Sequence, residues 1–299
     1  MAKNMNSYKY YVLDVFTNER YKGNPLSVVF TGSDLALFTY KKISKEFGYS
    51  ETSFIYYSNK DKALKVRSFT PTGFEVNGAG HNLLGAVCAA LLGNLNIFNE
   101  QEGEQFVIMK DRAIHLSINY IDTNIPIVGM RQKSAIIENV IAPEIIAGTI
   151  GIRQDDLSVD DLVPTVVKTE VAHLMVPIKN VEILNEVRPE KTLLSIAAKK
   201  YKFQGLYCFT LSNRSSLYFA QARFFNPGIG IDEDAATGSA AGPLAGLLFL
   251  KNHINQNNEY QILQGEKINR PSIIRFEVKN DGIWISGSSA VVMEGTIYE

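Results

Sequence analysis

Two glycine turns, each directly ahead of an apolar stretch, hold the residue types best suited to binding and proton transfer. Asn77–Gly80 is followed by His81, and Asp234 shortly precedes Ala236–Ser239. The start of a helix has unpaired backbone N–H groups and the positive end of the helix dipole, so it attracts an anion. Glycine at such a point lets a ligand approach the backbone closely. The turns therefore predict anion sites suited to a small carboxylate; glycines that serve only tight turns and helix packing are the alternative interpretation.

His81 and a run of acids add titratable groups to these turns. Near a helix N-terminus the cationic form of an imidazole is disfavoured, which leaves a neutral donor and acceptor suited to a substrate group. A structural role is the alternative for a lone histidine. The second turn follows three carboxylates, Asp232, Glu233 and Asp234, and this is more than the single acid that a helix cap requires.

Glu51 is a further candidate for proton transfer. It lies between a segment of helical spacing, Leu35–Phe47, and a strand-like segment, Ser53–Tyr57. A carboxyl group at the start of a strand, partly removed from water, has its pKa raised towards the range that a general acid/base needs. An ordinary solvated glutamate is the alternative, and the local sequence leaves both open.

The hydrophobic pattern predicts strands around two buried helices. Asn82–Leu92 and Ala240–Leu250 are apolar nearly all round, which is typical of helices inside a core. Much of the remaining chain has the pattern of strands. Such segments are Tyr10–Phe16, Leu26–Phe30, Leu64–Phe69, Phe106–Lys110, Ile114–Ile121, Ile127–Met130, Val163–Val176, Gly205–Thr210, Leu217–Phe225, Ile273–Val278, Ile283–Ser286 and Ala290–Glu299. Strands with a helix buried among them predict an α+β fold.

An internal repeat links the two halves of the chain. Arg67–Pro71 and Arg223–Pro227 share the pattern Arg-x-Phe-x-Pro, 156 residues apart. Each is followed by a glutamate and, five residues later, by a glycine of one of the two turns, with an offset of 158 residues between the copies. These pairs are Glu75 with Gly80 and Glu233 with Gly238. Both copies lead into a buried helix, which predicts two structurally similar domains.

The bulk composition excludes several classes of function. The 299 residues, 45% hydrophobic and 20% charged, suit a two-domain globular protein. Lys+Arg (30) and Asp+Glu (31) nearly cancel and no basic run occurs, so we expect no nucleic-acid partner. Cys88 and Cys208 lie in apolar runs and predict core thiols. No His/Cys pattern indicates a metal site.

The N-terminal segment and the longest apolar stretch predict a cytoplasmic protein. Met1–Tyr11 is polar and unlike a secretory signal. Ala235–Leu250, the longest apolar stretch, contains three glycines and a proline. It is also shorter than the roughly 20 residues of a membrane span. We therefore expect no membrane partner.

A series of short motifs resembles the PhzF family of phenazine-biosynthesis isomerases. In order along about residues 10 to 295, these motifs are Asp14-Val-Phe16, Gly23-Asn-Pro-Leu26, Ser50-Glu51-Thr52, Phe69-Thr-Pro71, Ala79-Gly-His81, Glu233-Asp-Ala-Ala-Thr-Gly-Ser239 and Gln264-Gly…Arg270-Pro-Ser272. The resemblance implies the diaminopimelate epimerase-like fold: two similar domains, each a β-barrel-like sheet around a central helix, with the active site between them. We accordingly expect domains at residues 1–125 and 126–285, with 286–299 as a final strand that returns to the N-terminal domain.

The same resemblance implies a cofactor-independent isomerase of the dihydro-hydroxyanthranilate type, acting on a small-molecule carboxylic acid. It implies Glu51 as the acid/base that moves the proton, with His81 and Asp234 as further catalytic groups. The implied substrate-binding residues are Gly80, Thr237, Gly238 and Ser239. It implies neither a cofactor nor a metal, and a homodimer in the cytoplasm.

Two other functions stay open on the same scaffold: a non-catalytic small-molecule binding protein, and an epimerase that uses carboxyl groups. A racemase with two thiols is not expected, since alignment of its Cys-Gly turns puts the thiols at Ala79 and Ala235. The chain also departs from the family's usual pattern at two places. One extra residue stands between Pro71 and Glu75, and Ala235 follows Asp234 where the family usually has proline.

Overall fold

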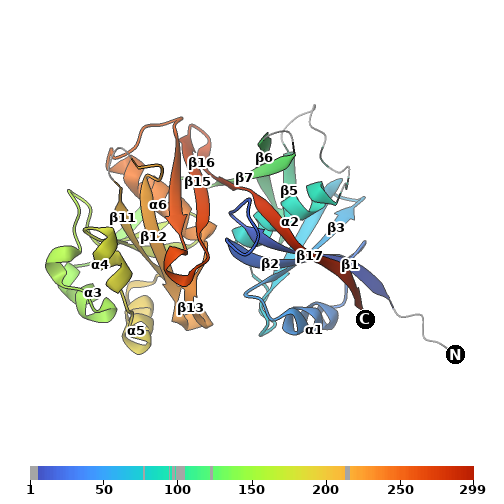
Figure 1. Ribbon diagram of the computed structural model, residues 1–299, viewed down its shortest axis with the longest axis horizontal. Coiled ribbons are helices and arrows are strands. Elements are labelled where there is room, and N and C mark those ends of the chain that lie inside the picture. The colour runs from blue at the N-terminus through green and yellow to red at the C-terminus, as the bar shows by residue number, and fades with distance from the viewer. Residues whose placement is uncertain are drawn as a thin grey trace. The chain divides into compact units, whose positions relative to one another are not determined.

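The computed structural model describes residues 6–76, 78–93, 95, 98, 105–121, 124–212 and 216–299. The chain forms two compact units (Figure 1). The first unit consists of Met1–Met130 and Ser286–Glu299, and the second of Arg131–Ile285. The final segment belongs to the first unit because β17 (Ser289–Tyr298) pairs antiparallel with β1 (Ser7–Val15).

The sheet of the first unit mixes antiparallel and parallel neighbours. Besides β17 and β1, its strands are β2 (Asn24–Phe30), β3 (Thr52–Ser58), β4 (Ala63–Phe69), β5 (Gln105–Met109), β6 (Arg112–Ile121) and β7 (Ile125–Gln132). From β17 to β6, successive pairs are antiparallel, antiparallel, parallel, antiparallel, parallel and antiparallel. Parallel neighbours require a crossover. The crossovers contain α1 (Leu37–Phe47), between β2 and β3, and α2 (His81–Leu92), between β4 and β5.

The sheet of the second unit repeats this order. Its strands are β8 (Ile136–Val140), β9 (Thr165–Lys168), β10 (Ala172–Pro177), β11 (Gly205–Leu211), β12 (Ala220–Asn226), β13 (Ile231–Asp234), β14 (Glu259–Gln264), β15 (Ser272–Lys279) and β16 (Gly282–Gly287). Along β8, β9, β10, β11, β12, β14 and β15 the pairs are again antiparallel, antiparallel, parallel, antiparallel, parallel and antiparallel. The α+β fold with two similar domains is therefore confirmed.

A buried helix lies against each sheet. In α2 every residue from His81 to Ala90 is buried, and the helix packs against β1, β2 and β3. Its counterpart α6 (Gly238–Leu250) is almost as completely buried and packs against β15 and β10 (Figure 1). Both predicted core helices are thus confirmed. They begin one and two residues earlier than predicted, so the ends of the glycine turns are already helical.

Shorter helices cover the outer faces of the two sheets. In the first unit, Tyr40 of α1 stacks on Phe69 with ring centroids 5.0 Å apart and meets Phe54 edge-on at 4.7 Å. In the second unit, α3 (Pro143–Ile150), α4 (Val181–Glu186) and α5 (Lys191–Tyr201) supply side chains to a cluster that includes Leu184, Leu194 and Phe225. The phenylalanines of the Arg-x-Phe-x-Pro repeat, Phe69 and Phe225, therefore both lie on an outer face.

The strand-rich segment Val163–Val176 contains two strands. It is an antiparallel hairpin of β9 and β10 with a break at residues 169–171. The hydrophobic pattern failed to predict α4, β8, β13 and β14.

The two cysteines behave as the sequence predicts. Cys88 and Cys208 are fully buried, which confirms them as core thiols. Burial raises the pKa of each thiol to about 12, so neither is a ready nucleophile. In the part of the chain that the structure describes, no helix is long and apolar enough to cross a membrane.

Candidate active site

The first glycine turn is held by Asn82, the second residue of α2. Its Oδ1 accepts hydrogen bonds from the backbone N–H groups of Gly80 and Leu83, both at 2.8 Å. Its Nδ2 donates to the carbonyl of Gly78 at 3.1 Å. The Asn82 side chain is buried, and hydrogen bonds are electrostatically stronger in such surroundings than in water. One carboxamide thus fixes the backbone that enters α2; Asn77, the first residue of the turn, lies outside the described residues.

His81, the first residue of α2, is held neutral. The residue is only 7% exposed, and its Nε2 atom has no hydrogen-bond partner among the residues that the structure describes. Burial lowers the pKa of the imidazole from 6.5 to about 4. Burial alone is thus enough to keep this imidazole neutral. A neutral imidazole with an unused ring nitrogen is suited to bind a ligand group.

Glu51 immediately precedes β3 and is half-buried, with its Oε2 atom removed from solvent. Ser53, two residues further on, donates from its hydroxyl to the carbonyl of Asn82 at 2.9 Å. Asn82 is the neighbour of His81 in the chain. The start of β3 and the start of α2 therefore lie together, and Glu51 and His81 lie at the same end of the first unit.

The second turn is built around a hydrogen-bonded group of Asp234, Thr237 and Gln264. The Thr237 hydroxyl donates to Oδ2 of Asp234 at 2.6 Å. Gln264 Nε2 donates to Thr237 Oγ1 (3.1 Å) and to the backbone carbonyl of Asp234 (2.9 Å). Gln264 Oε1 accepts from the Thr237 N–H (3.2 Å) and from the hydroxyl of Tyr207 (3.0 Å). Because the single proton of the Thr237 hydroxyl is directed at Asp234, the carboxylate is held as an acceptor.

The first residues of α6 are held by a second carboxamide. Gln132 Nε2 donates to the carbonyl of Gly238 at 3.0 Å. A side chain at Gly242, one helical turn further on, would collide with Oε1 of Gln132. Thr237 does not cap the helix with its side chain, because its hydroxyl is used by Asp234. Gly238 is buried and Ser239 is half-buried, so the helix start is only partly open to solvent.

The three consecutive acids before α6 have three different partners. Asp232 pairs with Lys191 at 2.6 Å, and Glu233 pairs with Arg223 at 2.8 Å. Only Asp234 turns towards the helix start, where Thr237 binds it. The excess of acids noted in the sequence is thus explained by ion pairs, and one acid remains for the turn.

Two sets of site residues are brought together, each within one unit. The first set is Glu51, Gly80 and His81, and the second is Asp234, Thr237, Gly238 and Ser239. Three amides that support these sets were not predicted as site residues: Asn82, Gln132 and Gln264. The only sequence signal for them is the Gln264-Gly pair in the motif series, since nothing local marks the other two.

The sequence matches a family model described as phenazine biosynthesis-like protein (PhzC-PhzF) over residues 13–295. The chain belongs to this family. The match extends over nearly the whole chain and confirms the resemblance to PhzF.

Individual family members agree with this assignment. An uncharacterized isomerase from Clostridium acetobutylicum is 31% identical over 308 residues, covering 98% of this chain and 99% of the relative. Trans-2,3-dihydro-3-hydroxyanthranilate isomerase from Pseudomonas aeruginosa is 28% identical over 296 residues, covering 97% and 99%. The crystal structure of a PhzF-family protein from Bacillus anthracis is 23% identical, with a TM-score of 0.84 and coverage of 98% and 99%. That structure supports the fold.

The segment between Pro71 and Glu75 of this PhzF-family chain forms part of a closed turn. The N–H of Thr70 donates to the carbonyl of Phe74 at 2.9 Å, and the N–H of Gly73 donates to the carbonyl of Thr70 at 2.9 Å. Gly73 has a φ of +81°, a conformation that favours glycine. The turn therefore ends at Phe74, and Glu75 starts the segment that leads to Gly80.

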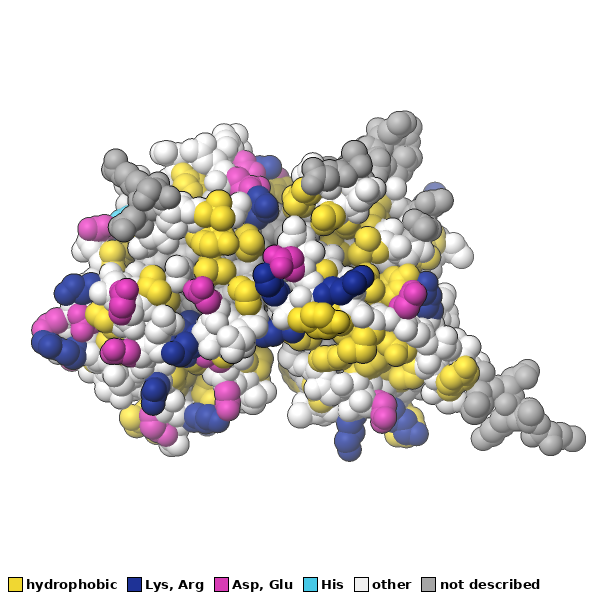
Figure 2. Space-filling model, in the orientation of Figure 1, with side chains coloured by type: hydrophobic (Ala, Val, Ile, Leu, Met, Phe, Trp, Pro, Cys, Tyr) yellow, Lys and Arg dark blue, Asp and Glu magenta, His cyan; other side chains and the backbone are white. Residues whose placement is uncertain are grey.

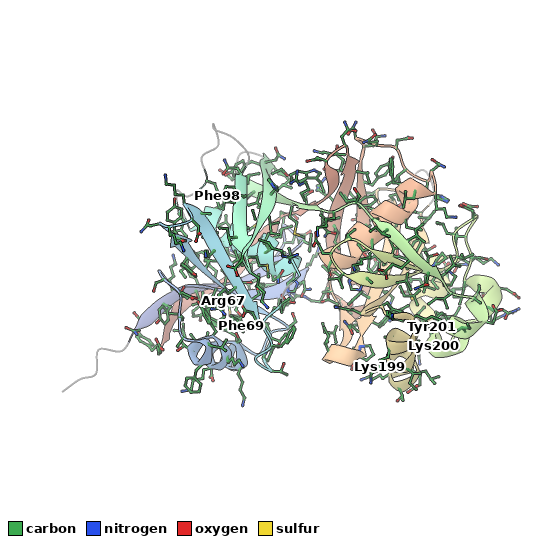
Figure 3. All side chains as sticks on the ribbon, turned by 180° about the vertical axis from the view of Figure 1, so that it is seen from behind. Arg67, Phe69, Phe98, Lys199, Lys200 and Tyr201 are labelled. Atoms are coloured by element: carbon green, nitrogen blue, oxygen red, sulfur yellow. The ribbon has the colours of Figure 1, made fainter. Side chains whose placement is uncertain are left out.

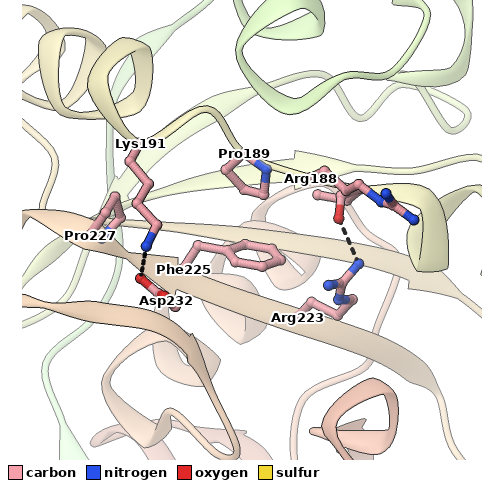
Figure 4. A pocket seen from close by; sticks show the side chains of 8 residues that line it. Arg188, Pro189, Lys191, Arg223, Phe225, Pro227 and Asp232 are labelled. Carbon is pink, nitrogen blue, oxygen red and sulfur yellow. Dashed lines mark hydrogen bonds and ion pairs between the residues drawn. The ribbon is translucent and has the colours of Figure 1, made fainter.

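A cavity of about 210 Å³ lies in the second unit (Figure 4). Its lining residues are Val187, Arg188, Pro189, Lys191, Arg223, Phe225, Pro227 and Asp232. None of these is a predicted site residue. The ion pair of Lys191 and Asp232 lies at its edge. The cavity is thus a feature of the outer face, on the side where Phe225 packs.

On the face shown in Figure 2, Lys/Arg and Asp/Glu side chains are interspersed, without a broad area of one sign. Among the described residues, no group of three or more His, Cys, Asp or Glu side chains is arranged to hold a metal ion.

Buried histidines predict that stability falls in mild acid. Burial lowers the pKa of both His81 and His173 from 6.5 to about 4. The unfolded chain takes up these protons near pH 6.5, so the contribution of each neutral imidazole is fully present above that pH and is lost as the pH falls towards 4. Between pH 7 and 5 we expect the free energy of unfolding to fall by about 2 kcal/mol per histidine. Urea unfolding at the two pH values measures this.

The variant His173→Asn separates the contribution of this histidine to the pH dependence of stability from the contribution of the carboxylates. The Nδ1 atom of His173 accepts the N–H of Gly205 at 3.2 Å, and an asparagine oxygen can replace it. The only tryptophan, Trp284, lies in the same unit as His173 and reports its unfolding by fluorescence. Between pH 7 and 5, the free energy of unfolding of the variant should fall by about 2 kcal/mol less than that of the wild type. An unchanged pH dependence would show that His173 is not the group responsible.

Proposed function

We propose that this PhzF-family protein is an isomerase that moves a proton within a small carboxylic acid of the dihydro-hydroxyanthranilate type. The observation that carries the proposal is that a half-buried carboxyl group, Glu51, lies at the same end of the first unit as a neutral imidazole, His81, because Ser53 binds the start of α2. A carboxylate and a neutral ring nitrogen at a helix start are suited to proton transfer next to an anionic group.

In the proposed reaction Glu51 is both base and acid. Its carboxylate removes a proton from a carbon of the substrate, and the electron pair of that C–H bond moves into the conjugated system. The resulting carboxylic acid then returns the proton to another carbon of the same molecule. Substrate and product are isomers, so the step requires no oxidant, reductant or other co-reactant. The neutral His81 orients a polar group of the substrate through its unused ring nitrogen.

The second turn is proposed to bind the acid group of the substrate. Backbone N–H groups at a helix start favour a carboxylate. Thr237 is the N-cap residue of α6, Gly238 and Ser239 are its first two residues, and Gly238 has no side chain of its own to block the backbone. Asp234, held as an acceptor by Thr237, is suited to accept a hydrogen bond from an amine or hydroxyl of the substrate.

The strand register favours one acid/base over a symmetric pair. Phe54 lies opposite Arg67 in the first unit, and Cys208 lies opposite Arg223 in the second. Counting back three residues from each places Glu51 in correspondence with Gly205. The second unit therefore has no carboxylate at this position, which favours an isomerase that uses one carboxylate over an epimerase with matched acids on both units.

The direct test is turnover of trans-2,3-dihydro-3-hydroxyanthranilate in D₂O, followed by mass spectrometry and NMR. A shared carboxyl group exchanges its proton with solvent, so we expect an isomerised product with deuterium at the newly protonated carbon. Binding without turnover would indicate a non-catalytic binding protein. Deuterium at a stereocentre with loss of optical activity would indicate an epimerase. The absence of both binding and turnover would contradict the proposed substrate class.

A further inference from the structure

The Arg-x-Phe-x-Pro repeat forms the same ion pair in both units. Nε and Nη2 of Arg67 donate to the two carboxylate oxygens of Glu75 at 2.8 and 2.9 Å. The same two atoms of Arg223 donate to the two oxygens of Glu233 at 2.9 and 2.8 Å. Each guanidinium also lies over the ring of the phenylalanine in its own repeat, 5.3 and 4.9 Å from the ring centroid. Arg67 and Phe69 are labelled in Figure 3, and Arg223 and Phe225 in Figure 4.

The surroundings of the two pairs differ. Nη1 of Arg67 donates to Asp34 at 3.0 Å, and the ring of Tyr40 covers the guanidinium at 4.6 Å. Nη1 of Arg223 instead donates to two backbone carbonyls at the end of α4, both at 2.9 Å. The other partners of the arginine therefore differ between the two units. The ion pair itself, and the five-residue spacing from its glutamate to a turn glycine, are the same in both. What the two copies share is the link between the ion pair and the turn.

In the second unit the pair determines the side of the sheet to which Asp234 points. β13 runs antiparallel to β12, with Asp234 opposite Phe224. Successive side chains of a strand point to opposite faces. Because Glu233 is bound to Arg223 on the outer face, its neighbour Asp234 points to the inner face. There it receives the hydroxyl of Thr237 at 2.6 Å.

In the first unit the pair fixes the segment that leads to His81. Glu75 forms a β-bridge with Phe69, and the N–H of Val76 donates to the carbonyl of Ser68 at 2.8 Å. The glycine turn begins directly after this attachment. The ion pair therefore holds the turn to β4 at one end, while Asn82 holds it at the other.

We propose that Arg67 and Arg223 are positioning residues of the candidate site. Each fixes the glutamate that starts a glycine turn, and thereby orients the site group that follows: His81 in the first unit and Asp234 in the second. The proposal rests on the proposed function in so far as that function places these two groups in the site. Arginine is required, because its planar fork binds both carboxylate oxygens and a lysine ammonium does not.

The test compares Arg67→Lys with its matched control Arg223→Lys in the full-length protein. Imidazole signals are followed by NMR between pH 5 and 8, with the His81 signal assigned from a His81→Gln variant. In the wild type His81 should stay neutral over this range, since its pKa is about 4. In Arg67→Lys we expect a loosened turn to admit water to Nε2 and to raise this pKa by at least about one unit. In Arg223→Lys we expect no change at His81.

Thermal unfolding of both variants separates positioning from general loss of stability. Both substitutions weaken a buried or half-buried ion pair and should lower the melting temperature, but only Arg67→Lys should move the His81 titration. An unchanged His81 titration in Arg67→Lys, or an equal shift in Arg223→Lys, would overturn the proposal. If Arg67→Lys does not fold, Glu75→Gln keeps the side-chain size and decides the same question.

Turnover of trans-2,3-dihydro-3-hydroxyanthranilate in D₂O is measured in parallel. It tests the role of Arg223 at the second turn. We expect Arg223→Lys to lower kcat by about 10- to 100-fold with a smaller change in KM, since a misplaced site group impairs the chemical step. An unchanged kcat would overturn the role of Arg223. A wild type that does not turn over the compound would contradict the proposed function alone, and the His81 titration would still decide the role of Arg67.

Discussion

Glu51→Gln is expected to lower kcat by about 10³- to 10⁴-fold while the affinity for the ligand changes little. General acid/base groups contribute up to about 10⁴-fold, and the upper part of this range applies because one carboxyl group both removes and returns the proton. Glutamine has nearly the same shape but neither gives nor takes a proton at neutral pH. The start of β3, which holds Glu51, is fixed by the hydrogen bond from the Ser53 hydroxyl to the carbonyl of Asn82 in α2. The substitution does not touch this bond.

The measurement is kcat and KM of the variant, with the dissociation constant of the substrate or product determined by calorimetry. Glu46→Gln is the matched control, since Glu46 is an exposed residue of α1 outside the candidate site. The control should retain wild-type turnover. Activity of Glu51→Gln within about tenfold of the wild type would refute Glu51 as the acid/base.

The repeated architecture was predictable because its determinants are local. Apolar stretches beginning near Asn82 and Ala240 predict two buried helices from the local sequence. The repeat at Arg67 and Arg223 is readable in the sequence because each arginine and its glutamate lie within one short segment, 8 residues apart in the first copy and 10 in the second. The matching order of strand pairings in the two sheets then follows from two copies of one unit.

The glutamine side chains that hold the second turn were not predictable, because their partners are distant in the sequence. Gln264 is 27 residues from Thr237, and Gln132 is 106 residues from Gly238. No periodicity or spacing rule connects positions so far apart, and a buried glutamine has the same sequence signature as a solvated one. The partners of Asp232 and Glu233 likewise became clear only from the folded β13, so the acidic run alone did not show which of its members faces the turn.

Gly265→Ala is expected to destabilise the protein by about 2–5 kcal/mol. Gly265 has a φ of +79°, which costs an alanine about 1–2 kcal/mol. In addition, a Cβ atom there would lie 2.5 Å from the carbonyl oxygen of Ala235 and would also collide with that of Arg270. Both neighbours are backbone atoms, so no side-chain rotation relieves the overlap. Since Ala235 follows Asp234, the displacement would also move the second turn.

Gly230→Ala is the matched control for this prediction, because Gly230 lies in the same unit and has a φ of +85° with nothing within 4 Å of an added Cβ. It tests the conformational cost alone, about 1–2 kcal/mol. Urea unfolding followed by the fluorescence of Trp284 compares the two variants in the unit that contains both. The excess loss in Gly265→Ala should be about 1–3 kcal/mol. Equal losses would mean that the backbone around Ala235 and Arg270 moves aside at little cost, and that the second turn is not held as tightly as its hydrogen bonds imply.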